Sequence, residues 1–168
     1  AWRRHVIVGH HLVSGSISPS AAGTVLHHHQ HYDGSGFPTR EDEEGRLRGL
    51  IGEEIHVYAR IVCLANHFDR LRRPADGTIR PRVSVLRQML TSELSRRFDP
   101  VILATLPLVV PAYLPGSIVA LNDGRRALVR HWHPDSPCQP TVLPLDDRKL
   151  PVLDGNDEPT PVDLRQRP

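Results

Sequence analysis

A run of histidines is the feature of this sequence most able to do chemistry. Residues 27–31 read His-His-His-Gln-His, and they close a segment whose apolar spacing predicts a helix. Neutral imidazole is the commonest protein ligand for transition metals. Because neighbouring positions on an α-helix point about 100° apart, we expect His28 and His29 to serve two different ions of a multinuclear site. A solvated polar helix end with fortuitous metal affinity explains the run equally well when it is taken alone.

Further polar residues occur in a fixed order around this run. His5 lies one predicted helix upstream and begins the sequence His-Val-Ile-Val-Gly. Residues 33–38 read Asp-Gly-Ser-Gly-Phe-Pro, and residues 59–71 carry Asn66 and Asp69 within an apolar helical pattern. The stretch 32–54 is rich in Gly, Asp and Glu and has little apolar periodicity, which predicts a long loop. Loops of that length in compact domains are usually functional.

A set of helices must position these groups. The apolar spacing predicts helices over residues 2–13, 18–30, 55–73 and 81–97, and a short one from Phe98. The second is expected to begin with Ser18 as its N-cap and Pro19 in its first turn. The third is expected to bury the residues that recur at three- and four-residue steps, which are Ile55, Tyr58, Ile61, Val62, Ala65, Phe68 and Leu71.

The composition changes after about residue 106. Twelve of the 16 prolines lie from Pro100 onward, and helical periodicity disappears. Short strands are predicted over 117–121, 127–132 and 141–145, with the first two joined by a hairpin turn at Asn122-Asp-Gly. We therefore expect a mainly α fold with a helical bundle over 1–106, a small C-terminal β subdomain over 107–153 and a disordered tail over 154–168.

Charge and composition restrict the classes of partner. The net charge is +2 and the two signs are interspersed, so a nucleic-acid polymer is not an expected partner. Cys63 and Cys138 stand in unrelated contexts and predict neither a disulfide framework nor a thiolate zinc site. The longest apolar run contains Pro107 and Pro111 and is too short to span a bilayer, and we expect a cytoplasmic protein. The chain opens at Ala1 in helix-like sequence, so we expect a piece of something longer.

The motifs together resemble the HD-GYP family of bacterial, metal-dependent cyclic-di-GMP phosphodiesterases. In that family a His-x-x-x-Gly helix, a His-His pair, a DG-x-GYP loop and an Ala-Arg-Ile…Asp-x-x-Asp-Ala-Leu helix occur in this order. The likeness covers residues 4–71, and the stretches at Phe98 and at 115–124 are also similar to the family's tail. It implies an HD-type helical bundle in which His5, His28 and His29 are metal ligands, and Asn66 stands where the family has a ligating aspartate.

The resemblance also assigns roles to the neighbouring residues. It places Asp33, Gly34, Gly36, Phe37 and Pro38 in a loop that borders the substrate cleft and contacts partners. Gly34 and Gly36 suit that role if they take positive φ and admit a phosphate close to the backbone. Asp69 is a candidate acceptor of a hydrogen bond from a metal ligand, or else a solvent-facing residue. Arg72 or Arg73 is a candidate contact for a substrate phosphate. We expect Arg60 to be structural, and the other histidines, His31 and His67 among them, to lie at the surface.

Several departures from the family pattern leave the function open. The His-Asp doublet is absent, Gln30 replaces the usual Glu, Phe37 replaces Tyr and the expected lysine is missing. The first hypothesis is hydrolysis of cyclic-di-GMP to pGpG or GMP with two or three Fe, Mn or Zn ions. The alternative is a degenerate module that binds cyclic-di-GMP or a signalling partner such as a diguanylate cyclase (GGDEF) domain. Another HD-type nucleotide phosphohydrolase, or a truncated copy without function, also stays open.

Overall fold

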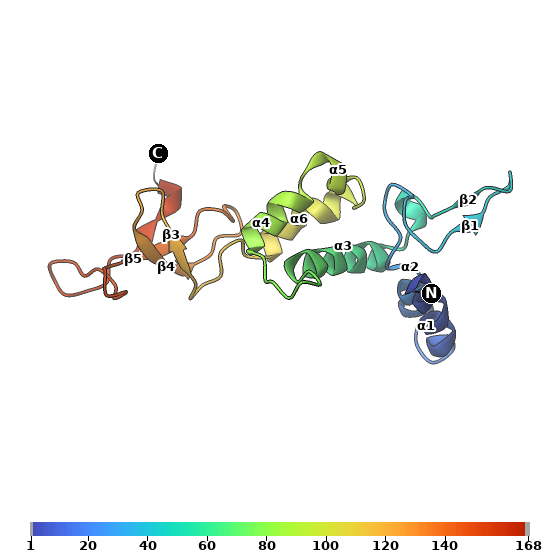
Figure 1. Cartoon of the computed structure of the whole chain (residues 1–168), viewed down its shortest axis with the longest axis horizontal. Helices are drawn as coiled ribbons and strands as arrows, with labels where there is room; N and C mark the ends of the chain where they lie inside the picture. Colours follow the sequence, from blue (N-terminus) through green and yellow to red (C-terminus); the bar gives the residue numbers. More distant parts are fainter. Residues whose placement is uncertain (1, 167–168) are drawn as a thin grey trace. The chain divides into compact units, whose positions relative to one another are not determined.

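The chain is mainly helical with a small antiparallel β part, as the sequence predicts. The structure is a computed structural model that describes residues 2–166, apart from the side chain of Ser92. It divides into two compact units, one up to Thr105 and one from Leu106. Figure 1 shows the elements coloured along the sequence. None of the helices in the described part of the chain has the length and apolar character needed to cross a lipid bilayer.

The first unit is mainly helical, and its first four α-helices pack on one another in the order in which they occur in the sequence. Its elements are η1 (Trp2–Arg4), α1 (His5–Val13), α2 (Pro19–His27), β1 (Arg40–Glu41), β2 (Leu47–Arg48), η2 (Gly52–Glu54), α3 (Val57–Arg72), α4 (Arg82–Met89), α5 (Ser92–Ser95) and α6 (Pro100–Val109), of which α6 runs on into the second unit. Helix α1 packs on α2, α2 on α3, and α3 on α4. The loop between α2 and α3 carries the two-stranded β1–β2 hairpin.

The helix boundaries differ from the sequence prediction in informative ways. Ser18 caps α2 as expected, because its hydroxyl accepts a hydrogen bond from the Ala21 N–H at 3.3 Å. The helix then ends at His27, three residues before the predicted end. The predicted helix over 81–97 is broken, since Thr91 takes an extended conformation between α4 and α5. The Thr91 hydroxyl donates to the Gln88 carbonyl at 2.7 Å, a local bond that competes with a continuous helix.

The buried face of α3 is only partly the one that hydropathy predicts. Ile55 just before the helix is fully buried as predicted, but the buried residues within the helix are Ala59, Cys63 and Leu64. The side chains of Tyr58, Ile61 and Val62 are exposed instead. Both sides of this helix carry apolar residues, so periodicity cannot choose between them. Small side chains at Ala59 and Cys63, one turn apart, form the face that packs inward.

A buried ion pair joins α3 to the start of α6. The Arg60 guanidinium contacts a carboxylate oxygen of Asp99, and their side chains are 17% and 8% exposed. The other Asp99 oxygen accepts from the backbone N–H groups of Val101 at 2.8 Å and Ile102 at 3.2 Å, the pattern of a helix N-cap. The expected structural role of Arg60 is therefore confirmed.

The second unit is a four-stranded antiparallel sheet in the order β3-β4-β5-β6. Its elements are β3 (Ile118–Ala120), β4 (Arg126–His131), β5 (Thr141–Leu145), β6 (Val162–Asp163) and η3 (Leu164–Gln166). The predicted turn joins β3 to β4, where Leu121 N–H donates to Arg125 O at 2.8 Å and Gly124 takes a φ of 83°. Ala127, Val129 and Val142 form the core of this unit.

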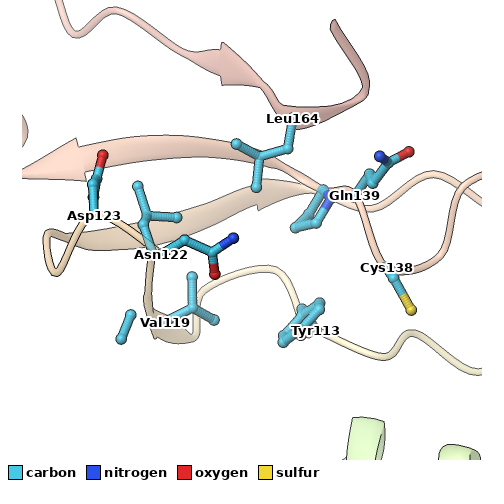
Figure 2. Close-up of a pocket in the computed structure, with 10 residues that line it drawn as sticks. Tyr113, Val119, Asn122, Asp123, Cys138, Gln139 and Leu164 are labelled. Carbon is cyan, nitrogen blue, oxygen red and sulfur yellow. The ribbon is translucent and has the colours of Figure 1, made fainter. Parts of the chain in front are cut away.

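The C-terminal segment departs from the expected disordered tail. Within 154–166, Val162–Asp163 pairs with β5 as an edge strand, while residues 167–168 of the predicted tail lie outside the described residues. Leu164, which follows β6, also lines a hollow of about 450 Å³ beside Tyr113, Val119 and Gln139 (Figure 2). The sheet is thus completed by a segment whose composition alone predicts no structure.

Candidate metal centre

Three imidazoles from two helices meet in the first unit. His5 opens α1, and His28 and His29 follow the last residue of α2. One ligand atom from each lies within 4.8 Å of those of the other two, and the ring centroids of His28 and His29 are 4.2 Å apart. All three predicted histidines therefore converge on one place. Ligand atoms this close suit one ion or two neighbouring ions about 3.5–4 Å apart, so the expectation that His28 and His29 serve two different ions stays a prediction.

Backbone carbonyls fix the protonation of two of these rings. His5 Nδ1 lies 2.7 Å from Trp2 O, and His28 Nδ1 lies 2.8 Å from Val25 O. A carbonyl oxygen can only accept, so each Nδ1 carries the ring's proton and each Nε2 keeps its lone pair. Metal-ligating histidines are commonly oriented in this way. The two rings are therefore held in the tautomer that binds a metal through Nε2.

The third ring is kept neutral by its surroundings. His29 is buried, and Phe37 stacks on it with the ring centroids 4.7 Å apart. Burial first, and then the nearby His28 and His5, lower the pKa of His29 from 6.5 to about 4. Neutral imidazole is the form that binds metals. At neutral pH this ring needs no deprotonation before it can act as a ligand.

We expect the stability of the metal-free chain to fall as the pH drops from about 6.5 towards 4. The pKa values of His29 and His31 are both lowered from 6.5 to about 4, mainly by burial. Between these pH values the unfolded chain binds more protons than the folded chain, so protonation favours unfolding. Above about pH 7 neither group contributes a pH dependence. Urea unfolding between pH 7 and 4.5 measures the slope, and His31→Gln should reduce it. An equal slope in that variant would contradict the assignment.

Aromatic rings and two guanidinium groups border the three histidines. The Trp2 ring lies 5.1 Å from the His29 ring and 5.4 Å from the Phe37 ring, centroid to centroid. Arg70 Cζ lies 5.4 Å from the centre of the Trp2 ring, and Arg3 Cζ lies 5.2 Å from the centre of the Phe37 ring. Sequence reasoning missed Trp2, Arg3 and Arg70. The signal for Arg70 is its position four residues after Asn66, on the same face of α3.

The arginines and the aspartate predicted near the site have other partners. Arg72 Nη1 donates to the Arg80 carbonyl at 2.7 Å, which occupies its guanidinium with backbone. Arg73 Nη1 lies 3.6 Å from a carboxylate oxygen of Asp69, and both side chains are mostly exposed. Of the two roles considered for Asp69, its exposed pair with Arg73 favours the solvent-facing one. Asn66 lies on α3 and is partly buried, and its role as a ligand stays a prediction.

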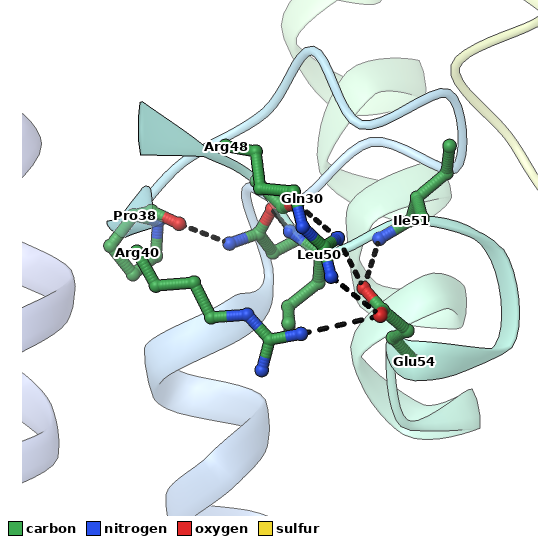
Figure 3. A network of polar contacts seen from close by, with 8 residues as sticks. Gln30, Pro38, Arg40, Arg48, Leu50, Ile51 and Glu54 are labelled. Atoms are coloured by element: carbon green, nitrogen blue, oxygen red, sulfur yellow. Dashed lines mark hydrogen bonds and ion pairs between the residues drawn. The ribbon is translucent and has the colours of Figure 1, made fainter. Parts of the chain in front are cut away.

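The loop over 33–38 is held by the buried amide of Gln30. Its Nε2 donates to the Pro38 carbonyl, and its Oε1 accepts from the Leu50 N–H at 3.0 Å (Figure 3). Nearby, the Glu54 carboxylate accepts from Arg48 at 2.8 and 2.9 Å and from the Ile51 N–H at 3.0 Å. These bonds, with that from Arg48 the strongest, lower the pKa of Glu54 to about 2. The Gln30 amide thus donates one hydrogen bond, to Pro38, and accepts one, from Leu50. An ionised carboxylate at position 30 could accept but could not donate.

The two glycines of the loop have different reasons for being glycine. Gly34 takes a φ of 81°, as expected, but Gly36 is not among the residues with positive φ. Gly36 is buried against the backbone of residues 29–31, and a Cβ there would lie 2.6 Å from Gln30 Cα and closer still to His29 O and His31 N. The expectation that Gly36 takes a positive φ is wrong, and glycine is required there because backbone fills the space that a Cβ would occupy.

The chain is similar to one family of known proteins. The family model described as "HD domain" matches residues 1–102. The chain is 35% identical over 101 residues to the cyclic di-GMP phosphodiesterase response regulator RpfG of Xanthomonas campestris. The aligned stretch covers 58% of the chain and 24% of that relative. It is 27% identical over 128 residues to a cyclic di-GMP phosphodiesterase of Pseudomonas aeruginosa. The aligned stretch covers 75% of the chain and 28% of that protein.

A third relative extends the same comparison. The chain is 36% identical over 77 residues to a cyclic di-GMP phosphodiesterase of Thermotoga maritima. The aligned stretch covers 43% of the chain and 18% of that relative. The matched part of the chain thus covers between 18% and 28% of the length of these relatives. The chain belongs to the HD domain family, and its resemblance to the HD-GYP phosphodiesterases is confirmed.

Proposed function

We propose that this chain is part of a metal-dependent phosphodiesterase that hydrolyses cyclic di-GMP to pGpG or GMP in bacterial second-messenger signalling. The observation that carries the proposal is the convergence of His5, His28 and His29, whose ligand atoms lie within 4.8 Å of one another. Support comes from three relatives that are all named cyclic di-GMP phosphodiesterases. Motif order in the sequence and ligand grouping in the fold are separate observations, and both favour the same chemistry.

The donor set fits a transition-metal ion. Three neutral imidazoles suit Fe, Mn or Zn better than Mg or Ca, which prefer oxygen ligands. We propose His5 and His28 as ligands through Nε2, with His29 as the third and the Asn66 amide as a weak fourth. A bound ion of this class supplies Lewis acidity towards water and towards phosphoryl oxygens. The protein's part is to hold the rings in the binding tautomer through Trp2 O and Val25 O.

The surroundings of the histidines suit a nucleotide. The Trp2 ring is 57% exposed and offers a face on which a guanine base can stack, an interaction worth about 1–3 kcal/mol per base. The guanidinium groups of Arg3 and Arg70, which lie over the Phe37 and Trp2 rings, are donors suited to phosphate oxygens. We propose that these two arginines take the role expected of Arg72 and Arg73.

A second candidate function is a binding module without catalysis. Among the described residues, the group of close metal ligands around His5 contains no carboxylate, and Asn66 is an amide where the family has a carboxylate. Neutral ligands alone hold multiply charged ions less tightly. In this case the chain binds cyclic di-GMP, or a diguanylate cyclase domain through residues 33–38, without turning substrate over.

Turnover and binding of cyclic di-GMP by the Mn²⁺-loaded protein separate the two functions. If the chain is a phosphodiesterase, turnover should fall by at least about 100-fold in His28→Ala. Removing a residue that only hydrogen-bonds to a metal ligand typically costs less, roughly 10–100-fold. His11→Ala, an exposed histidine on α1, is the matched control and should retain activity. Binding without turnover, with turnover gained in Asn66→Asp, would support the binding module. Neither binding nor turnover in any variant would reject both functions.

A further inference from the structure

A second group of metal-binding side chains shares no residue with the first three histidines. Cys63 and His67 stand one turn apart on α3, and His31 lies in the loop after α2. One ligand atom from each lies within 4.8 Å of those of the other two. Cys63 Sγ is 3.8 Å from His67 Nδ1, and the rings of His31 and His67 are 5.2 Å apart, centroid to centroid. Neither histidine is the surface residue that the sequence predicts, since both are partly buried.

We propose that His31, Cys63 and His67 form a second metal site, which takes a zinc-like ion through one thiolate and two imidazoles. One sulfur and two nitrogens suit Zn²⁺ or a similar thiophilic ion, and the set leaves a fourth tetrahedral position for water. Hard ions such as Mg²⁺ and Ca²⁺ prefer oxygen. Such an ion would tie the loop that carries His31 to helix α3.

The orientation of the His31 ring is set by a chain of hydrogen bonds. The Ser35 hydroxyl donates to an Asp33 carboxylate oxygen at 2.6 Å, and the same hydroxyl oxygen lies 2.8 Å from His31 Nδ1. Since the hydroxyl proton is used on Asp33, the oxygen accepts from the Nδ1–H of His31. A carboxylate that acts through a second group to orient a histidine is typical of the surroundings of metal ligands. Asp33 therefore supports the orientation of His31 through Ser35.

The other two residues are held in place by helix and core. The Cys63 carbonyl lies 3.0 Å from His67 Nδ1, and the Phe98 ring packs edge-on against the His67 ring at 5.1 Å between centroids. A carbonyl oxygen can only accept, so His67 Nδ1 carries the ring's proton and Nε2 is the nitrogen that is free to bind a metal.

The environment of Cys63 excludes the roles that a reactive cysteine would have. Its side chain is 2% exposed, and burial raises the pKa of the thiol to about 12. Such a thiol is neither a nucleophile nor a ready target of oxidants, because both need an accessible thiolate. A bound cation changes this, since a coordinating thiol is deprotonated outright. The thiol proton is then released to solvent as the metal–sulfur bond forms.

Titration of the metal-free chain with Co²⁺ tests this site. Co²⁺ replaces Zn²⁺ in such sites, and a bond to thiolate gives a charge-transfer absorption that imidazoles alone do not give. We expect the absorption in the native chain and in Cys138→Ser, which removes the exposed cysteine, and its loss in Cys63→Ala. His31→Gln, in the loop, should weaken Co²⁺ binding by at least about tenfold. Circular dichroism and thermal unfolding check that each variant folds.

Any of the following results would overturn the proposal. The first is a native chain that gives no thiolate-to-cobalt absorption, and the second is an absorption that persists in a folded Cys63→Ala. If Cys63→Ala does not fold, unchanged Co²⁺ affinity in His31→Gln decides against the site. The third is equal loss of the absorption in His28→Ala, because the site is defined as separate from the His5, His28 and His29 centre.

Discussion

Replacement of Asp99 by alanine is expected to lower the free energy of unfolding by about 3–5 kcal/mol, the usual cost of leaving one partner of a buried ion pair alone. Arg60 would keep its charge in a site where its side chain is 17% exposed. The same change removes the acceptor for the Val101 and Ile102 N–H groups, and a lost N-cap costs about 1 kcal/mol. Urea unfolding at pH 7 measures the difference.

Two control variants separate the contributions of Asp99. Asp99→Asn keeps an oxygen that can cap α6 but removes the charge, so its loss should be smaller than that of Asp99→Ala. Asp69→Ala breaks the exposed pair with Arg73, and exposed pairs are worth about 0–1 kcal/mol. Equal losses in Asp99→Ala and Asp69→Ala would show that the buried pair does not hold α3 to α6.

Replacement of Gly36 by alanine is expected to damage both the fold and the metal centre. The new methyl group would overlap His29 O and His31 N and lie 2.6 Å from Gln30 Cα. All three are backbone atoms, which cannot move aside as the end of a flexible side chain can. Overpacking of this kind costs about 1–3 kcal/mol or more. Because the displaced backbone carries His29, the variant should also bind Mn²⁺ more weakly.

Gly23 provides the matched control for Gly36. It lies within α2, and a Cβ there meets no atom within 4 Å. Gly23→Ala should therefore stabilise the chain by about 0.5–1 kcal/mol, as helix propensity predicts. Thermal unfolding and Mn²⁺ titration of the two variants give the comparison. A folded Gly36→Ala with native stability and native Mn²⁺ affinity would contradict the tight packing of residues 29–36.

Motif order in the sequence could predict which histidines meet, but not how they meet. His5, His28 and His29 were selected from the order and spacing of four motifs, and the fold brings them together. Helix α2 ends at His27, and no capping residue in the sequence marks that end. The sequence therefore could not predict the backbone conformation of the residues that carry the His28 and His29 rings.

Residues that act through tertiary contacts gave no readable signal. Cys63 and His67 have the spacing of one helical face, but His31 reaches them only through the path of the loop after α2. Gln30 seemed a plain departure from the family's Glu, yet its amide bonds both Pro38 and Leu50 (Figure 3). On α3, apolar residues occur on two faces, and the pattern alone favoured the exposed one.

Anomalous scattering from crystals of the Mn²⁺- or Zn²⁺-loaded chain, measured at the absorption edge of the metal, would locate the bound ion. We expect a peak bonded to His5, His28 and His29, with zinc–nitrogen distances of about 2.0–2.1 Å and contact through Nε2 of His5 and His28. The proposed site at Cys63 would give a separate peak and does not replace the first. Metal-loaded crystals with no peak at the three histidines would contradict the assignment of this chain's metal centre.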